Sequence, residues 1–361
     1  MKSSETDKLF TRAENLRRKN RYSEALSLLG EALKLYSSSG DFRGVVDCRL
    51  SIADINRMTG DFEKAKKSYA HAIKVAGKIC DIPSVADAEA GIGLSVRAQG
   101  DWKGALEMIS SAMEYYESVD DRHGVAFSLW AAAGSLRIKG DIPEAIDTFK
   151  KALKAFRTLK EEPSIGYCLC GLGGTSRIAG RFRHSLNYYN QANTMFAEMK
   201  DTFGTAYSYC GIGNAYRMTG DYGSALAFFK KASSLYSKIG DRVSFAYTLW
   251  SMGTTHKMLS DYGNASVSFQ AARDLFKQTK DPRGLIYCSL GFGEIALIEN
   301  RKKTAGKYLG NSVREAGKYG FAVEKCHAEM LFSALSGKPK TGCYKKLGLN
   351  LKFDTMPFNL P

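Results

Sequence analysis

The chain has 361 residues, of which 44% are hydrophobic and 25% charged, and its 52 basic and 37 acidic residues give a formal net charge of +15. This composition excludes an intrinsically disordered chain and is typical of a folded protein. The chain has no apolar run long enough to span a bilayer, and its start, MKSSETDKLF, lacks the apolar core of a secretory signal, so we expect a cytoplasmic protein with no membrane span.

The chain repeats itself every forty residues, without insertion or deletion, from its first residues to about position 320. One place in the repeat is always small: Ala13, Ala53, Gly93, Ala133, Gly173, Gly213, Gly253 and Gly293. Twelve and nineteen residues later, every repeat again carries alanine or serine. A fixed period of this length predicts a stack of identical supersecondary units, an architecture that presents a long binding surface.

Residues 201–240 show what one unit contains. Each half ends in glycine, which tolerates the left-handed conformation past a helix end, and the next half begins with aspartate, which accepts hydrogen bonds from free helix N–H groups. We expect second helices to be capped by Asp61, Asp101, Asp141, Asp221 and Asp261, and first helices by Asp41, Asp81, Asp121, Asp201, Asp241 and Asp281. The unit is therefore predicted to be two antiparallel helices of about 16 residues each.

The repeat resembles the tetratricopeptide repeat (TPR). The residues that carry the resemblance are Ile212-Gly213, Tyr216, Gly220-Asp221-Tyr222, Ala225, Phe229 and Ala232. The usual repeat has 34 residues and a closing proline; this 40-residue version lacks that proline and is similar to Leu-Gly-Asn polarity adaptors, kinesin light chains and bacterial peptide-receptor regulators. The resemblance covers residues 5–320 and implies a right-handed solenoid whose first helices line a concave groove for peptides or partner helices.

We therefore predict an all-α fold, a right-handed α-solenoid of eight helix–turn–helix repeats over residues 1–320. A capping helix over residues 321–336 and a basic, partly apolar extended tail over residues 337–361 follow, the tail because apolar residues alternate from Leu347 to Phe353. Five lysines in this tail should be repelled by an arginine-lined groove. We expect the tail to pack on the last repeat, or to serve as a tag that a partner reads, rather than to enter the groove.

The groove-facing stripe of the first helices carries a ladder of basic residues. With Gly213 counted as the eighth position, the twelfth position holds Arg17, Arg57, Arg97, Arg137, Arg177, Arg217 and Lys257. The N-terminal rungs lie near acids such as Asp7, Asp47 and Asp87. From about residue 94 to 290 the acids are replaced by glycines and aromatic residues.

We predict that this second region binds an acidic, partly apolar segment of another protein. The predicted site comprises Arg97, Arg137, Arg177, Arg217, Lys257, Phe127, Tyr167, Tyr207, Tyr247, Tyr287, Trp130, Trp250 and Asn214.

A structural interpretation of the same residues stays open. Arginine in the last turn of a helix is favoured by the dipole, and several rungs lie four residues before an aspartate. Each such exposed pair is worth only about 0.3–0.5 kcal/mol, which does not require arginine. Arg17 and Arg177 also persist where the paired position holds Arg21 or Arg181. The aromatic residues could equally serve packing between repeats.

Catalytic and metal sites are not expected. Five of the eight cysteines recur at two repeat positions, which is typical of buried thiols rather than a disulfide framework, and Cys168 and Cys170 point about 200° apart on a helix. The histidines, at 71, 123, 184, 256 and 327, are scattered. The glycine-rich stretches GIGLSV and GLGGTS follow no strand, as a dinucleotide site would require. We predict no enzyme activity, no metal and no cofactor.

The function that these features favour is a non-enzymatic scaffold or adaptor whose groove binds a segment of a partner protein. A regulator that senses a small peptide is one alternative. The other is a nucleic-acid-binding protein, because arginines interleaved with aromatics can stack bases, although the basic residues are dispersed and no nucleic-acid-binding motif occurs. From Arg301 onward, 12 basic and 4 acidic residues give a surplus of 8, which favours an acidic partner. The oligomeric state is not predicted.

Overall fold

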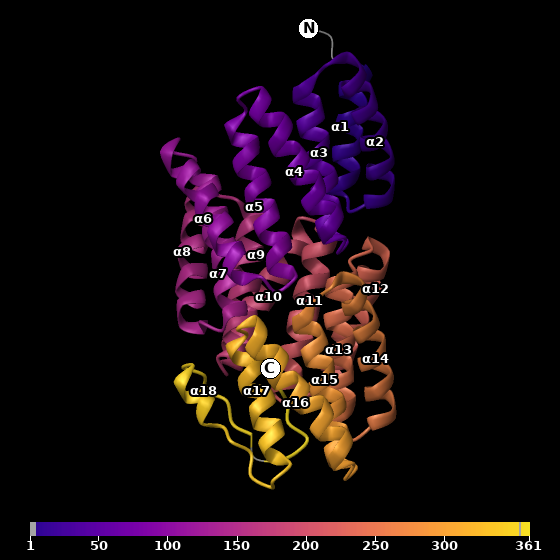
Figure 1. The fold of residues 1–361 in the computed structure, drawn as a ribbon, viewed down its shortest axis with the longest axis vertical. Helices are drawn as coiled ribbons and strands as arrows, with labels where there is room; N and C mark the ends of the chain where they lie inside the picture. Colours follow the sequence, from indigo (N-terminus) through magenta and orange to yellow (C-terminus); the bar gives the residue numbers. More distant parts are fainter. Residues whose placement is uncertain (1–4, 354) are drawn as a thin grey trace. The chain divides into compact units, whose positions relative to one another are not determined.

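A computed structural model describes residues 5–353 and 355–361 (Figure 1). These residues form eighteen α-helices and no β-strand. They divide into two compact units, Met1–Ala132 with Lys238–Asp241, and Ala133–Ser237 with Arg242–Pro361. None of the helices in the described residues is both long and apolar enough to cross a membrane.

Unit 1 contains three helix pairs and the start of a seventh helix. The pairs are α1 (Glu5–Arg18) and α2 (Tyr22–Ser39), α3 (Phe42–Met58) and α4 (Phe62–Lys78), and α5 (Ile82–Ala98) and α6 (Trp102–Ser118). Helix α7 (Arg122–Lys139) begins in unit 1 and ends in unit 2.

Unit 2 continues the alternation with helices of 17 or 18 residues up to α16, followed by α17 of 13 residues and α18 of 5 residues. Its helices are α8 (Ile142–Leu159), α9 (Glu162–Ile178), α10 (Phe182–Glu198), α11 (Thr202–Met218), α12 (Tyr222–Ile239, of which the last two residues fall in unit 1), α13 (Arg242–Met258), α14 (Tyr262–Thr279), α15 (Pro282–Ile298), α16 (Lys302–Tyr319), α17 (Ala322–Ala334) and α18 (Gly342–Lys346).

Small residues let the two helices of a repeat approach closely. Ala225 and Ala232 on α12 are fully buried, and a Cβ added to Gly213 on α11 would lie 2.7 Å from Phe229 Cε1 and 3.1 Å from the carbonyl oxygen of Ala225. The place that is always small in the sequence is therefore a contact surface between the paired helices, because any larger side chain there would displace an aromatic ring.

The helix ends follow the expected chemistry at most positions. The side chains of Asp41, Asp81, Asp101, Asp121, Asp201, Asp221, Asp261 and Asp281 each accept a hydrogen bond from the backbone N–H three residues later. Asp61 and Asp141 precede helices but accept no such cap hydrogen bond, so the prediction was wrong for these two. The first backbone N–H groups of α4 and α8 therefore receive no hydrogen-bond acceptor from these two side chains.

Residues 337–361, which were predicted to be an extended tail, contain a short helix. Helix α17 is followed by the five-residue helix α18, so the alternation of apolar residues from Leu347 to Phe353 does not form a strand. Leu349 is buried, whereas Leu351 and Phe353 are half-buried. A period-two pattern also arises when one side of a chain packs against other residues without pairing in a sheet.

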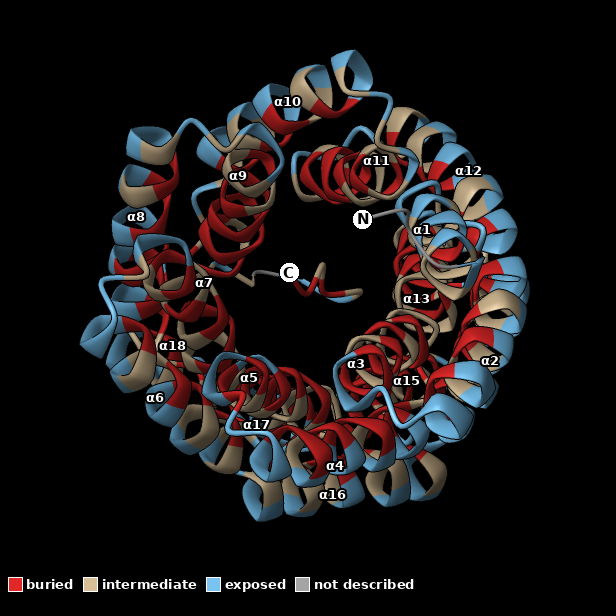
Figure 2. Cartoon of the chain, turned by 90° about the horizontal axis from the view of Figure 1, so that it is seen from above, coloured by how far each residue is buried: buried red, intermediate tan, exposed pale blue. Residues whose placement is uncertain are grey.

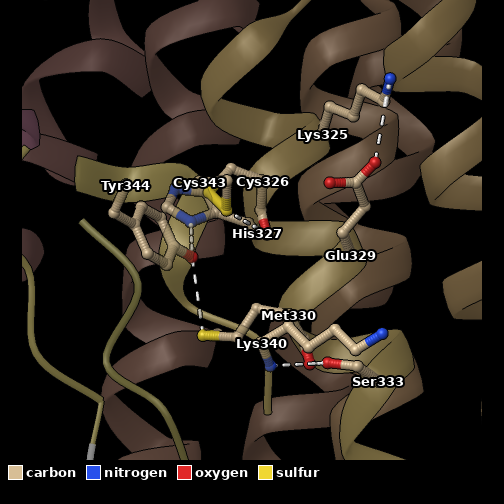
Figure 3. The surroundings of a disulfide bond; sticks show 9 residues. All are labelled: Lys325, Cys326, His327, Glu329, Met330, Ser333, Lys340, Cys343 and Tyr344. Atoms are coloured by element: carbon tan, nitrogen blue, oxygen red, sulfur yellow. Dashed lines mark hydrogen bonds and ion pairs between the residues drawn. A yellow bond between two sulfur atoms is a disulfide. The ribbon is translucent and has the colours of Figure 1, made fainter. Parts of the chain in front are cut away.

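A disulfide joins Cys326 on α17 to Cys343 on α18, with Cα atoms 5.8 Å apart (Figure 3). The expectation of buried thiols rather than disulfides does not hold for this pair. The two residues lie beyond the repeats, where the recurrence that marked Cys48, Cys168 and Cys288 as buried core thiols no longer applies. Beside the bond, the hydroxyl of Tyr344 lies 2.8 Å from Nδ1 of the buried His327.

Candidate functional site

In unit 2 the odd-numbered helices carry the site. Figure 2 shows that α9, α11, α13 and α15 expose few residues, while α10 and α12 expose many. Helix α14 is likewise exposed over much of its length. The last residues of the chain lie on the side of the odd-numbered helices. Phe358 and Leu360 are only 2% and 3% exposed. We call residues 356–361 the terminal segment.

A buried ion pair binds the main chain of Phe358. Lys257 on α13 contacts Glu294 on α15, and both side chains are essentially inaccessible. The Lys257 ammonium also donates to the Phe358 carbonyl oxygen at 2.8 Å, and the Phe358 N–H donates to the Glu294 carboxylate. Burial lowers the pKa of Lys257, an effect that the charge of Glu294 opposes. The pair therefore satisfies a peptide N–H and a peptide C=O together.

Arg217 on α11 binds the next two residues. Its guanidinium donates to the Leu360 carbonyl oxygen at 2.9 Å and to the side-chain oxygen of Asn359, whose amide in turn donates to the Arg217 carbonyl oxygen at 2.7 Å. The side chain is fully buried, and burial, together with the positive charge of Arg177, lowers the pKa of Arg217 to about 9.

Other residues of the groove hold Arg217 in place. Asn214, one turn earlier on the same helix, accepts from Arg217 Nε at 3.3 Å and from Nη2 at 3.0 Å. The guanidinium also lies over the Trp250 ring, 5.6 Å from its centroid. Asn214 and Trp250, which the sequence placed among the ligand contacts, are thus buried supports of the arginine.

The preceding residues of the chain follow the ends of these helices. The backbone N–H of Asn350 donates to the carbonyl oxygen of Ala179, just past α9, at 3.1 Å, and a Cβ at Gly180 would collide with the Asn350 carbonyl oxygen. Residues 350–353 line a pocket of about 430 Å³ together with Phe182, Met218 and Met258. The path therefore runs along the C-terminal ends of α9, α11, α13 and α15.

The prediction that the tail would avoid the groove was wrong. Its five lysines, Lys338, Lys340, Lys345, Lys346 and Lys352, are all exposed, and the part that enters the groove is the uncharged sequence Phe-Asn-Leu. The main-chain carbonyl groups of that sequence accept hydrogen bonds from the basic residues. The repulsion argument treated the tail as one charge, whereas only its uncharged end approaches the cations.

Two further rungs of the ladder lie in unit 2. Within the described chain, Arg177 Nε and Nη1 are buried and have no hydrogen-bond partner. Arg137 reaches Gly174, where an added Cβ would lie 3.0 Å from Arg137 Nη1 and 3.0 Å from the Tyr189 hydroxyl. Glycine at this place gives the arginine its space, and Arg177 retains two donors that an acceptor on a ligand could satisfy.

The predicted aromatic residues contact other side chains of the protein, either in the next repeat or in their own. Tyr167 donates to the capping carboxylate of Asp201 at 2.8 Å, and Tyr287 donates to Glu324 at 2.9 Å. Tyr247 packs against Phe276 with ring centroids 4.7 Å apart, and Tyr207 stacks on Phe203 at 6.3 Å. These contacts account for the aromatic residues through packing; contact with a ligand stays a prediction for them.

The remaining predicted residues lie in unit 1 and are described separately. Arg97 donates to the Ala131 carbonyl oxygen at 2.9 Å and lies over the Trp130 ring, 5.8 Å from its centroid. Phe127 packs against Trp130, with centroids 5.7 Å apart. Unit 1 also has a pocket of about 480 Å³, lined by Arg17, Arg57, Asp47, Asp54, Asp87, Phe127 and other residues.

The acids of this unit 1 pocket are engaged by neighbours within the unit. Asp54 accepts from Tyr69 at 2.6 Å and from Arg57 at 3.2 Å, and Asp87 accepts from Tyr116 at 2.6 Å.

Sequence reasoning missed Glu294 and the terminal segment. Glu294 stands in the apolar stretch GFGEIALI, and a single acid in such a helix was a signal that it faces a buried cation. It occupies the same place in its repeat as Asn214. Among the described residues, no group of three or more histidines, cysteines or carboxylates is placed to hold a metal ion.

Comparison with known families agrees with the repeat and its geometry. A family model described as the tetratricopeptide repeat matches residues 6–78, 84–158 and 202–278, more than half of the chain. The chain belongs to the tetratricopeptide repeat family. A search of curated proteins found no match to this TPR chain.

Solved structures with the same fold include peptide complexes. A Rap protein complexed with competence and sporulation factor is 14% identical, with a TM-score of 0.61 over 95% of this chain and 98% of that chain. The Rap conjugation gene regulator of plasmid pLS20 with the Phr* peptide is 13% identical, with a TM-score of 0.65 over 87% and 95%. NprR with its cognate peptide NprX is 14% identical, with a TM-score of 0.57 over 92% and 100%. These similarities establish the fold.

Proposed function

We propose that this TPR protein is a non-enzymatic peptide-binding protein, either a scaffold or a peptide-responsive regulator. Its groove along the C-terminal ends of α9, α11, α13 and α15 binds an extended segment of a partner protein. The observation that carries this proposal is the terminal segment itself. It lies in the groove with its main chain bound by the buried charges of Arg217, Lys257 and Glu294.

The buried charges of Arg217 and Lys257 each bind a main-chain carbonyl group of the terminal segment. Removing a charged side chain from water costs several kcal/mol unless partners satisfy it. A groove that holds main-chain groups through charged side chains recognises a peptide backbone. Three of the similar structures are complexes with a peptide or with competence and sporulation factor, which supports the proposal.

The partner and compartment follow from the same features. Arg177 retains donors without an acceptor within the described chain, so we propose a partner segment that carries an acidic group.

A cytoplasmic location stays a proposal, and the Cys326–Cys343 disulfide is a bond that a reducing compartment opens. Trapping of thiols during extraction would show which form is present in cells.

A displayed library of random peptides tests the proposed function. The bait is the full chain with Phe358→Ala and Asn359→Ala, which removes the side-chain anchors of the terminal segment. We expect enrichment of one class of peptides, and loss of that enrichment when Arg217→Glu is added. Arg183→Glu, an exposed arginine on α10, is the matched charge control and should leave enrichment unchanged. A bait that retains its helical circular dichroism but enriches no peptide class would refute the proposal.

A further inference from the structure

We propose that the terminal segment is an internal ligand that competes with the partner, and that the partner offers the same chemistry plus an acidic residue. The partner segment would be extended, with an aromatic residue, a side-chain amide and an aliphatic residue in succession, followed by a carboxylate. This inference rests on the proposed function and deepens it, because it names the ligand class.

The first two features come from the contacts of Phe358 and Asn359. Phe358 is bound through both main-chain groups, and its ring is 2% exposed and lies 5.8 Å from the ring of Phe353. Asn359 forms a two-way contact with Arg217, accepting through its side-chain oxygen and donating to the Arg217 carbonyl group. A side-chain amide is the group that has a donor and an acceptor at this spacing.

The acidic feature comes from the direction of the segment. Residue 358 contacts α13 and α15, and residues 359 and 360 contact α11, so the chain runs toward α9. On α9 the corresponding rung of the ladder is Arg177, forty residues before Arg217. Its Nε and Nη1 are buried without an acceptor in the described chain, and its charge lies close enough to lower the pKa of Arg217.

The internal segment therefore leaves one cation unsatisfied. Its Phe-Asn-Leu sequence binds Lys257, Glu294 and Arg217, whereas Arg177 Nε and Nη1 find no acceptor in the described chain. An external segment that brings a carboxylate to Arg177 gains a charge-assisted hydrogen bond that the described terminal segment does not make. The internal segment has the advantage of being tethered to the same chain. The difference in binding free energy between the internal and the external segment sets the partner concentration that is needed to displace the terminal segment.

Fluorescent peptides amidated at the C-terminus test this proposal, because amidation removes the terminal charge. The peptides are MPFNLPE, MPFNLPQ and MPFNLPK. We expect all three to bind the wild-type chain weakly, and MPFNLPE to bind the Phe358→Ala/Asn359→Ala chain at least tenfold more tightly, since the competing segment no longer occupies the groove. The affinity order should be Glu, then Gln, then Lys, and Arg177→Gln should remove the difference between Glu and Gln.

Two controls keep the test decisive. If the double variant loses its helical circular dichroism, Asn359→Lys replaces it, because a lysine beside Arg217 expels the segment by charge repulsion. Equal affinity of MPFNLPE for the wild-type and released chains overturns the competition. Failure of all three peptides to bind a released chain that enriches another class in the displayed library overturns this inference but leaves the proposed function standing. If the library also enriches nothing, both fall.

Discussion

Rungs of the basic ladder at opposite ends of the chain differ in what satisfies them. Arg17 pairs with Glu14 at 2.7 Å and Arg57 with Asp54 at 3.2 Å, and each acid lies in the same repeat as its arginine. Arg217 and Lys257 instead donate to main-chain carbonyl groups of the terminal segment. The sequence predicted this change along the ladder, because the acids disappear after Asp87. It could not show that a distant part of the same chain supplies the partners.

Glu294→Gln should strongly destabilise the C-terminal unit, because it leaves the Lys257 charge buried without a counter-ion. Breaking a buried pair on one side costs about 3–5 kcal/mol. The free energy of unfolding in urea measures the effect. Glu299→Gln on the same stretch is the control, since Glu299 is exposed beside Arg301 and such pairs contribute only about 0–1 kcal/mol. Equal effects of the two changes would contradict the role given to Glu294.

His327 should make stability depend on pH. Burial, with Arg283 and Arg177 nearby, lowers its pKa to about 4, against an opposing effect of Glu324. Between pH 4 and 6.5 the unfolded chain binds a proton at this residue that the folded chain does not, so stability falls as pH drops through this window. The difference between the ordinary His pKa of 6.5 and a pKa of about 4 corresponds to roughly 3 kcal/mol.

Unfolding in urea at pH 7 and pH 4.5 checks this dependence. His327→Asn retains a polar atom toward Tyr344 but does not titrate. Between pH 7 and pH 4.5 its free energy of unfolding should fall less than that of the wild type, by about the amount given above for His327. The same loss in both chains would show that His327 is not the titrating group.

At the scale of the helix pair, the sequence predicted nearly everything because packing repeats with the period. The place of Gly213 is small in every repeat, and the structure shows aromatic side chains or carbonyl groups against it. After residue 320 the sequence predicted one helix, but the period could not predict α18 or how these elements pack. Their packing depends on single contacts, such as Arg283 with Glu324 at 2.6 Å, that occur once in the chain.

Gly213→Ala should destabilise the protein although alanine is the better helix former. The new Cβ would lie 2.7 Å from Phe229 Cε1, and overpacking of a buried contact costs about 1–3 kcal/mol. Gly223→Ala in the partner helix is the matched control, because its nearest neighbour would be 3.8 Å away. That change should be neutral or stabilising by up to about 1 kcal/mol. Thermal unfolding distinguishes the two, and a stabilised Gly213→Ala chain would contradict the packing argument.

The disulfide should hold α18 and the residues after it close to α17. Cys343→Ser opens a loop with a sequence separation of 17 residues, and a bond closing a loop of this size contributes about 3 kcal/mol. We expect a lower free energy of unfolding and faster amide hydrogen exchange over residues 342–353. Cys80→Ser, at an exposed free thiol, is the control and should change neither. Unchanged exchange in the Cys343→Ser chain would show that α18 is held by other contacts.

At the scale of the whole molecule, one repeat builds both units, yet the groove residues of the two units are satisfied differently. In unit 1, tyrosines of the second helices donate to Asp54 and Asp87. In unit 2, the terminal segment occupies the corresponding stripe. Repetition in the sequence therefore predicted the scaffold, and the departures from repetition indicated the region of the site. The terminal segment lies outside the repeats, so the forty-residue period could not predict that it binds in the groove.

We propose that unit 2 binds an extended peptide along the C-terminal ends of its odd-numbered helices, and photo-crosslinking can locate such a peptide. The amidated peptide MPFNLPE, with benzoylphenylalanine in place of phenylalanine, is irradiated with the Phe358→Ala/Asn359→Ala chain, and the crosslinked residues are mapped by mass spectrometry. We expect crosslinks to α13 and α15 near Lys257 and Glu294. These crosslinks should be lost when unlabelled peptide is added in excess. Crosslinks confined to α1–α6, or none that unlabelled peptide suppresses, would contradict it.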